Sequence, residues 1–118
     1  MKNVKLENEL LEFANDFCNL MDWPLLPIER IKVSKMRNYK GWMIPHPSQD
    51  CLFIILSQYE AKDNKDLFST LIHELIHGHI LVNTKHHAKA HKHGKRFKKL
   101  AKKVEEVTNG FYTVNDIL

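Results

Sequence analysis

The strongest constraint on the fold is an apolar pattern that recurs every three or four residues between positions 66 and 82. Leu67, Leu71 and Leu75 share one face of a helix with this period, so the pattern predicts a long helix over 66–82. At 118 residues the chain is long enough to bury one modest core. We therefore expect a single domain over residues 1–118, and we refer to the helix over 66–82 as the central helix.

Shorter signals on both sides of this helix complete the predicted elements. Helices are predicted over 6–21 and about 94–108, and strands over 28–33, 41–44 and 51–56. Asp63 or Asn64 is expected to cap the central helix, Asn109-Gly110 to end the last helix, and residues 111–114 to be extended. The order helix, strands, helix, helix predicts an α+β fold with a small antiparallel sheet.

The central helix carries the sequence His73-Glu74-Leu75-Ile76-His77. Residues four apart lie on one helix face, so His73 and His77 can direct two imidazole nitrogens at the same zinc ion. Glu74 is turned about 100° from His73, which places its carboxylate beside the metal without making it a ligand. From there it can accept a proton from zinc-bound water. This HExxH pattern favours a zinc hydrolase with Glu74 as general base; the alternative is a helix with two polar surface histidines.

A catalytic zinc site needs three protein ligands and one open position, so a third ligand has to come from elsewhere in the chain. The metzincin arrangement places a glycine three residues after the second histidine and a histidine three residues beyond that. Ile80 and Asn83 occupy these positions, which excludes that arrangement. Glu105 and Glu106 are candidate ligands, but both lie toward the far end of the last helix and outside its predicted buried stripe.

Better candidates for the third ligand lie immediately before the last helix, in the segment His91-Lys92-His93-Gly94. A histidine here can face the central helix across the intervening loop. Gly94 gives the backbone freedom to turn, and Phe97 anchors the last helix in the core. The residues alone leave both His91 and His93 open.

HExxH followed by a loop and then His-Gly-x-x-Phe resembles the SprT-like zinc peptidases, a family that includes the Spartan-type DNA-dependent proteases. The matching residues are His73, Glu74, His77, His93, Gly94 and Phe97. The resemblance covers about residues 37–100 and favours His93 over His91 as the third ligand. It implies a compact, mini-zincin-like domain with one zinc ion per chain, bound by His73, His77 and His93, and with a catalytic Glu74. It also implies protein or peptide substrates, often proteins on DNA.

Cysteine usage sets this chain apart from many relatives in that family, which append a cysteine-rich zinc ribbon after the protease domain. The chain has only Cys18 and Cys51, which form no CxxC pair and lie among apolar residues. We expect two buried thiols and a minimal catalytic core.

Basic residues concentrate in one segment, since nine of the 18 Lys and Arg side chains lie between Lys85 and Lys103 with no acidic residue among them. Lys98, Lys99, Lys102 and Lys103 fall mostly opposite the apolar stripe of the last helix. This face either contacts DNA phosphates without sequence specificity or is simply solvated. It leaves open a second function, a basic DNA-binding module with a structural or vestigial zinc site. A zinc hydrolase that acts on a non-peptide bond is a third.

The remaining expectations concern location and single residues. No stretch approaches the ~18 apolar residues of a membrane span, and the N-terminus lacks the apolar run of a secretory signal. We therefore expect a cytoplasmic protein with no membrane contact. His79 is expected to have a structural role, and the strand Leu52–Leu56 to offer a sheet edge to an extended substrate. The aromatic residues Tyr39, Trp42 and Tyr59 are expected to pack in the core rather than to line the substrate groove.

Overall fold

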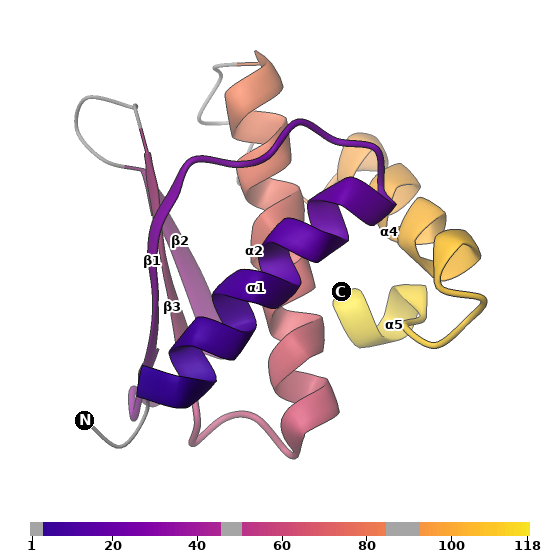
Figure 1. Cartoon of the computed structure of the whole chain (residues 1–118). Coiled ribbons are helices and arrows are strands. Elements are labelled where there is room, and N and C mark those ends of the chain that lie inside the picture. The colour runs from indigo at the N-terminus through magenta and orange to yellow at the C-terminus, as the bar shows by residue number, and fades with distance from the viewer. Residues whose placement is uncertain (1–3, 46–50, 85–92) are drawn as a thin grey trace.

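The computed structural model describes residues 4–45, 51–84 and 93–118. Its elements are α1 (Val4–Leu20), β1 (Ile28–Ser34), β2 (Gly41–Pro45), β3 (Leu52–Ser57), α2 (Asn64–Thr84), α4 (Lys95–Val107) and α5 (Val114–Ile117). Figure 1 shows α2 at the centre, with the three strands on one side, α4 and α5 on the other, and α1 crossing in front. The predicted α+β class is confirmed, whereas the mini-zincin likeness stays a prediction.

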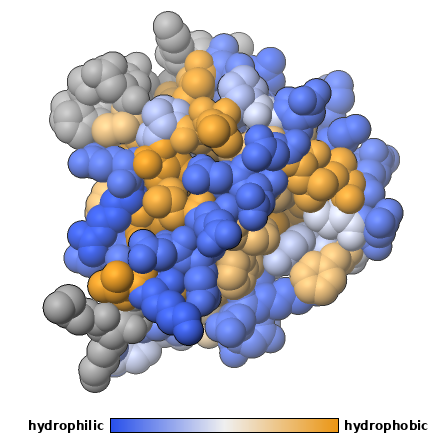
Figure 2. All heavy atoms as spheres, in the orientation of Figure 1, coloured by the Kyte–Doolittle hydropathy of each residue, from blue (hydrophilic) through white to orange (hydrophobic). Residues whose placement is uncertain are grey.

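Helix α1 covers the core as an amphipathic helix. Leu10, Ala14, Phe17 and Cys18 recur at helical spacing and are buried, so one face of α1 packs onto the rest of the molecule. Hydrophilic side chains form a band over the outward face of α1 in the view of Figure 2. The helix predicted over 6–21 is confirmed, with a start two residues earlier.

The sheet has the strand order β1-β3-β2, and its pairing corrects the predicted antiparallel sheet. β2 pairs with β3 antiparallel, but β1 pairs with β3 parallel. The chain reverses between β1 and β2 and again between β2 and β3, so β3 runs in the direction of β1. β3 then lies between the other two strands. Its central position follows from its side chains, because Leu52, Ile54 and Leu56 are all buried.

Helix α2 packs on β2 and β3 through the apolar face that its sequence predicted. The Asp63 side chain accepts a hydrogen bond of 2.8 Å from the N–H of Asp66 and so caps the first turn, as expected. Leu71, Ile72 and Leu75 are completely buried. Gly78 allows close packing, because a Cβ there would lie 2.8 Å from Leu52 Cδ1.

Helices α4 and α5 close the side of α2 that faces away from the sheet. α4 buries Phe97, Ala101 and Val104 and ends at Val107. The predicted stop signal Asn109-Gly110 follows directly after its C-cap Thr108, with positive φ angles of 53° and 80°. Residues 111–114 form no strand, which corrects the predicted extended segment. α5 follows instead, because the side chains of Thr113 and Asp116 each bond the other's backbone N–H in a capping box.

Three smaller findings complete the fold. Neither cysteine forms a disulfide; Cys18 is buried as expected, but Cys51 is partly exposed. Tyr39, Trp42 and Tyr59 are 63%, 55% and 54% exposed, so the prediction that they pack in the core is wrong. Within the described residues, no helix is both long enough and apolar enough to cross a membrane.

Candidate metal centre

Helices α2 and α4 bring three histidines together. His73 and His77 lie one turn apart on α2, and His93 lies two residues before α4 begins. Their Nε2 atoms form a small triangle, with 3.2 Å between His73 and His77, 3.0 Å between His77 and His93, and 3.2 Å between His93 and His73. These three are the only group of potential metal ligands found among the described residues.

The carbonyl of Ile117 in α5 orients His73. His73 Nδ1 lies 2.6 Å from this oxygen, which can only accept, so Nδ1 has to carry the proton. Nε2 of the neutral ring then presents its lone pair to the other two histidines. Burial lowers the pKa of His73 further than the Ile117 carbonyl raises it, and the neighbouring His93 lowers it as well. The neutral ring is the form that binds a metal ion.

The donor set fits zinc. Because His73 Nε2 has no proton to donate, at most two of the three close nitrogen contacts can be hydrogen bonds. A cation at the centre of the triangle would accept all three lone pairs at once. Three nitrogens bound to tetrahedral zinc at ~2.0–2.1 Å lie about 3.3–3.4 Å apart, close to the distances found here.

The ring of Phe97 contacts all three imidazoles. Its ring centroid lies 4.9 Å from those of His73 and His93 and 4.8 Å from that of His77. Phe97 is 1% exposed and anchors the first turn of α4 in the core. His93 is itself exposed, so its position depends on this anchor four residues later in the chain.

Glu74 lies in the same turn of α2 as His73, but it is not part of the histidine triangle. Its side chain is buried, with 6% exposed. Burial raises the pKa of Glu74 to about 7, although a hydrogen bond from the Met43 N–H in β2 lowers it in part. Gly41 lets β2 approach this carboxylate, because a Cβ there would lie 3.2 Å from Glu74 Oε2 and 2.8 Å from Thr70 Cγ2.

A cavity of about 240 Å³ opens beside the metal centre. It is lined by residues of the segment before β2, of α2 and of the C-terminal end: Asn38, Tyr39, Lys40, Gly41, Thr70, His73, Glu74, Asp116, Ile117 and Leu118. The cavity therefore gives a ligand access to the first histidine and to the carboxylate together. Tyr39 adds an exposed aromatic ring to the lining of the cavity. Its ring stacks on that of Trp42, with 6.3 Å between the ring centroids.

Of the other candidate ligands, the structure describes Glu105 and Glu106, and neither belongs to the histidine group. His91, the alternative third ligand, lies outside the described residues. Glu105 Oε1 accepts a hydrogen bond of 3.0 Å from the Val114 N–H and so helps to fix α5. Glu106 is exposed on α4. His79 stacks on Trp23 with 4.0 Å between ring centroids, in line with the structural role expected for it.

Sequence reasoning missed the groups that surround the triad. The Ile117 carbonyl and the Met43 N–H are backbone groups and leave no signal in residue identity. The Thr113-x-x-Asp116 spacing is a recognisable capping signal, and it would have predicted the short helix that delivers Ile117. The assignment of Glu74 as base and of the three histidines as zinc ligands remains a prediction.

Comparison with known protein families gives a match over nearly the whole chain. The model of the SprT-like family matches residues 8–115, a range that reaches from α1 to α5. Comparisons with curated proteins and with solved structures gave no match.

Proposed function

The chain belongs to the SprT-like family, and from this membership and the histidine triad we propose that it is a zinc-dependent peptidase. The observation that carries the proposal is the convergence of three imidazole nitrogens, two of them from HExxH, on one point. A buried carboxylate and His73 line the same cavity beside that point. A structural zinc site requires neither an adjacent carboxylate nor a cavity.

In the proposed reaction, His73, His77 and His93 bind the zinc ion and Glu74 moves the protons. Zinc so bound supplies a Lewis acid that polarises the scissile carbonyl and lowers the pKa of an attacking water. The Glu74 carboxylate accepts a proton from that water and later donates it to the leaving amine. The Met43 hydrogen bond holds the carboxylate in place beside the metal centre.

For the substrate we propose an extended peptide that pairs with β2. The earlier expectation assigned this role to the strand Leu52–Leu56, but β3 lies in the middle of the sheet with a strand on each side. β2 is an edge strand, and its first residue, Gly41, lines the cavity next to Glu74. A peptide that adds to this edge would pass beside the carboxylate. Exposed Tyr39 and Trp42 would then contact its side chains.

The proposal is tested by cleavage of a denatured, fluorescently labelled protein at pH 7.5. Zinc-loaded protein is expected to cleave it, a chelator to stop the reaction, and added zinc to restore it. His73→Ala is expected to lose both the bound zinc and the cleavage. His79→Ala serves as the matched control, because His79 lies on the same helix but points away from the triad.

Two results would contradict the proposal. One is a fully zinc-loaded chain that cleaves neither this substrate nor a mixed peptide library, which would leave a binding module or a hydrolase of another bond. The other is cleavage that survives complete removal of zinc, which would place the activity outside the triad.

A nucleic acid is the partner that the surface of α4 favours. Lys95, Lys98, Lys99, Lys102 and Lys103 are all exposed, and the first turn of α4 holds no acidic residue. Cations at a helix N-terminus oppose the helix dipole, and a bound anion would relieve this unfavourable interaction. We propose sequence-independent contact with DNA phosphates. DNA affinity is then expected to fall with salt, and the log–log slope to flatten by about 0.7–0.9 for each lysine changed to Gln.

A further inference from the structure

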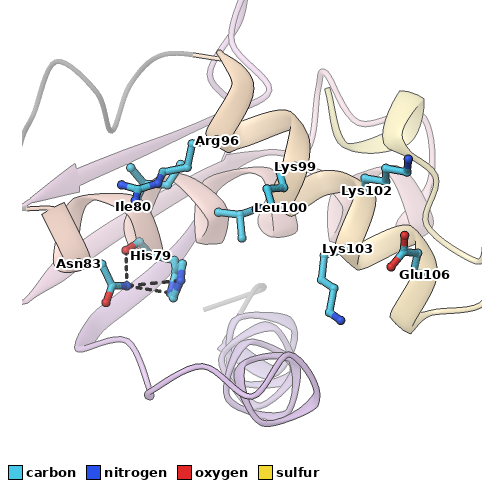
Figure 3. A pocket seen from close by; sticks show the side chains of 9 residues that line it. All are labelled: His79, Ile80, Asn83, Arg96, Lys99, Leu100, Lys102, Lys103 and Glu106. Carbon is cyan, nitrogen blue, oxygen red and sulfur yellow. Dashed lines mark hydrogen bonds between the residues drawn. The ribbon is translucent and has the colours of Figure 1, made fainter.

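A groove lies between α2 and α4, and it shares no lining residue with the metal-centre cavity. Its volume is about 730 Å³, within the usual range of small-molecule sites. Figure 3 shows the side chains that line it, which come from the last turns of α2 and from most of α4. Nothing in the proposed peptidase reaction uses this groove.

Positive charge dominates the α4 side of the groove. Arg96, Lys99 and Lys103 follow at spacings of three and four, so they share one face of the helix over about 10 Å. Lys102 also lines the groove. Within residues 4–45, 51–84 and 93–118, none of these four side chains makes a hydrogen bond or an ion pair. Glu106 is the only acidic residue among the described lining residues, so four cationic side chains share the groove with a single carboxylate.

The floor of the groove is apolar, and the side formed by α2 is held in place by contacts of His79 and Asn83. Leu100 is partly exposed and supplies aliphatic surface between the two helices, whereas Ile80, also in the lining, is only 1% exposed. The His79 ring is fixed by its stack on Trp23, with centroids 4.0 Å apart and an interplanar angle of 11°. Asn83 Nδ2 donates to the His79 carbonyl at 2.8 Å, which holds the amide beside the ring, as Figure 3 shows. A site with this floor and this rim suits a ligand that is apolar on one side and anionic on the other.

We propose that this groove binds a small organic phosphate, with its phosphate groups on Arg96, Lys99 and Lys103 and its apolar body over the aliphatic surface at Leu100. Phosphate fits better than carboxylate, because several cations within one small groove call for a compact group with more than one negative charge. Guanidinium and ammonium groups both donate charge-assisted hydrogen bonds to phosphate oxygens. The apolar floor distinguishes an organic phosphate from the inorganic ion. The proposal does not depend on the peptidase function.

Titration calorimetry of the zinc-loaded full chain tests the proposal with defined probes. ADP and octyl phosphate represent the two sources of organic phosphate, a nucleotide and a lipid-like chain. At least one is expected to bind with about one site per chain, and at least ten times more tightly than inorganic phosphate. Absence of binding by both at millimolar concentration would overturn the proposal, as would an inorganic phosphate that binds equally well.

Matched substitutions on α4 locate the site. Lys99→Gln and Arg96→Gln are each expected to weaken binding about tenfold or more, since each removes a charge-assisted hydrogen bond. Lys98→Gln removes the same charge from the same helix outside the groove, and its effect is expected to stay below about twofold. All three side chains are exposed, so the variants are expected to keep the parent's unfolding temperature, which is measured alongside.

Nucleic-acid binding gives a different pattern in the same experiment. A single-stranded oligonucleotide of twelve bases that contacts the whole basic face would be weakened by Lys98→Gln as much as by Lys99→Gln. If only the oligonucleotide binds, or if Lys98 matters as much as Lys99 for ADP and octyl phosphate, the groove is no separate ligand site and the proposal fails. Because the binding is measured on Glu74→Gln protein as well, a failure here is independent of whether the chain is a peptidase.

Discussion

Replacing Glu74 by glutamine tests what the burial of this carboxylate does to the metal-free protein. Burial raises the pKa of Glu74 from 4.5 to about 7. Between pH 4.5 and about pH 7, the folded state therefore keeps a proton on Glu74 that the unfolded state has already lost. Stability that is present below pH 4.5 is therefore lost as the pH rises to about 7. At 1.36 kcal/mol per pKa unit, the loss amounts to about 3 kcal/mol.

Glutamine keeps the size of the side chain and carries no charge at any pH, so it avoids this loss. In the presence of a chelator, Glu74→Gln is expected to exceed the parent's free energy of unfolding by about 3 kcal/mol at pH 8. The difference is expected to shrink toward zero near pH 4.5. Urea unfolding between pH 5 and pH 8 measures it. Exposed Glu9→Gln is the control and should show no such trend.

The reasoning about burial is refuted if the stability difference between Glu74→Gln and the parent does not change with pH. A parent that is more stable than the variant at pH 8 would also refute it, because the ionised carboxylate would then be well stabilised in the metal-free fold. Zinc has to be absent in this experiment, since a nearby cation would itself favour the ionised carboxylate.

Three further substitutions test the groups around the triad. His93→Ala is expected to lower zinc affinity by more than about 100-fold, measured by competition with a chelator. An unchanged affinity would show that His93 is not the third ligand and would favour His91. Gly41→Ala forces a Cβ against Thr70 Cγ2 and should cost about 1–3 kcal/mol in urea unfolding, with partial recovery when Thr70→Ser removes that methyl group. Thr113→Ala removes the cap of α5 and loosens the Ile117 carbonyl, so zinc affinity should drop about tenfold and recover in Thr113→Ser; equal affinities in all three proteins would dismiss this link.

The sequence was most informative where local periodicity decides the structure. The helices that carry the histidines are strongly periodic, and their predicted bounds agree with α2 and α4 to within a few residues. The HExxH spacing fixes where His73 and His77 point as soon as the segment is helical. His93 could be chosen over His91 only through the family resemblance, because nothing local distinguishes two histidines in a polar loop.

Features that depend on contacts between distant segments were not predictable in this way. The parallel pairing of β1 with β3 depends on which strand lies in the middle of the sheet, and three short strands do not determine that locally. The exposure of Trp42 follows from the same arrangement, because the helices cover only the face of β2 that carries Met43. The groove between α2 and α4 arises from their packing. The basic pattern of α4 alone indicated the charge but not the apolar floor.

The most direct test of the central claim is the peptidase rate of Glu74→Gln together with its zinc content, both measured on one sample. A positioned general base contributes about 10²–10⁴-fold to the rate. The variant is therefore expected to fold, to retain one zinc ion per chain, and to lose cleavage of the denatured substrate by that factor. A variant with full zinc occupancy that cleaves as fast as the parent would show that Glu74 is not the base and would contradict the proposed mechanism.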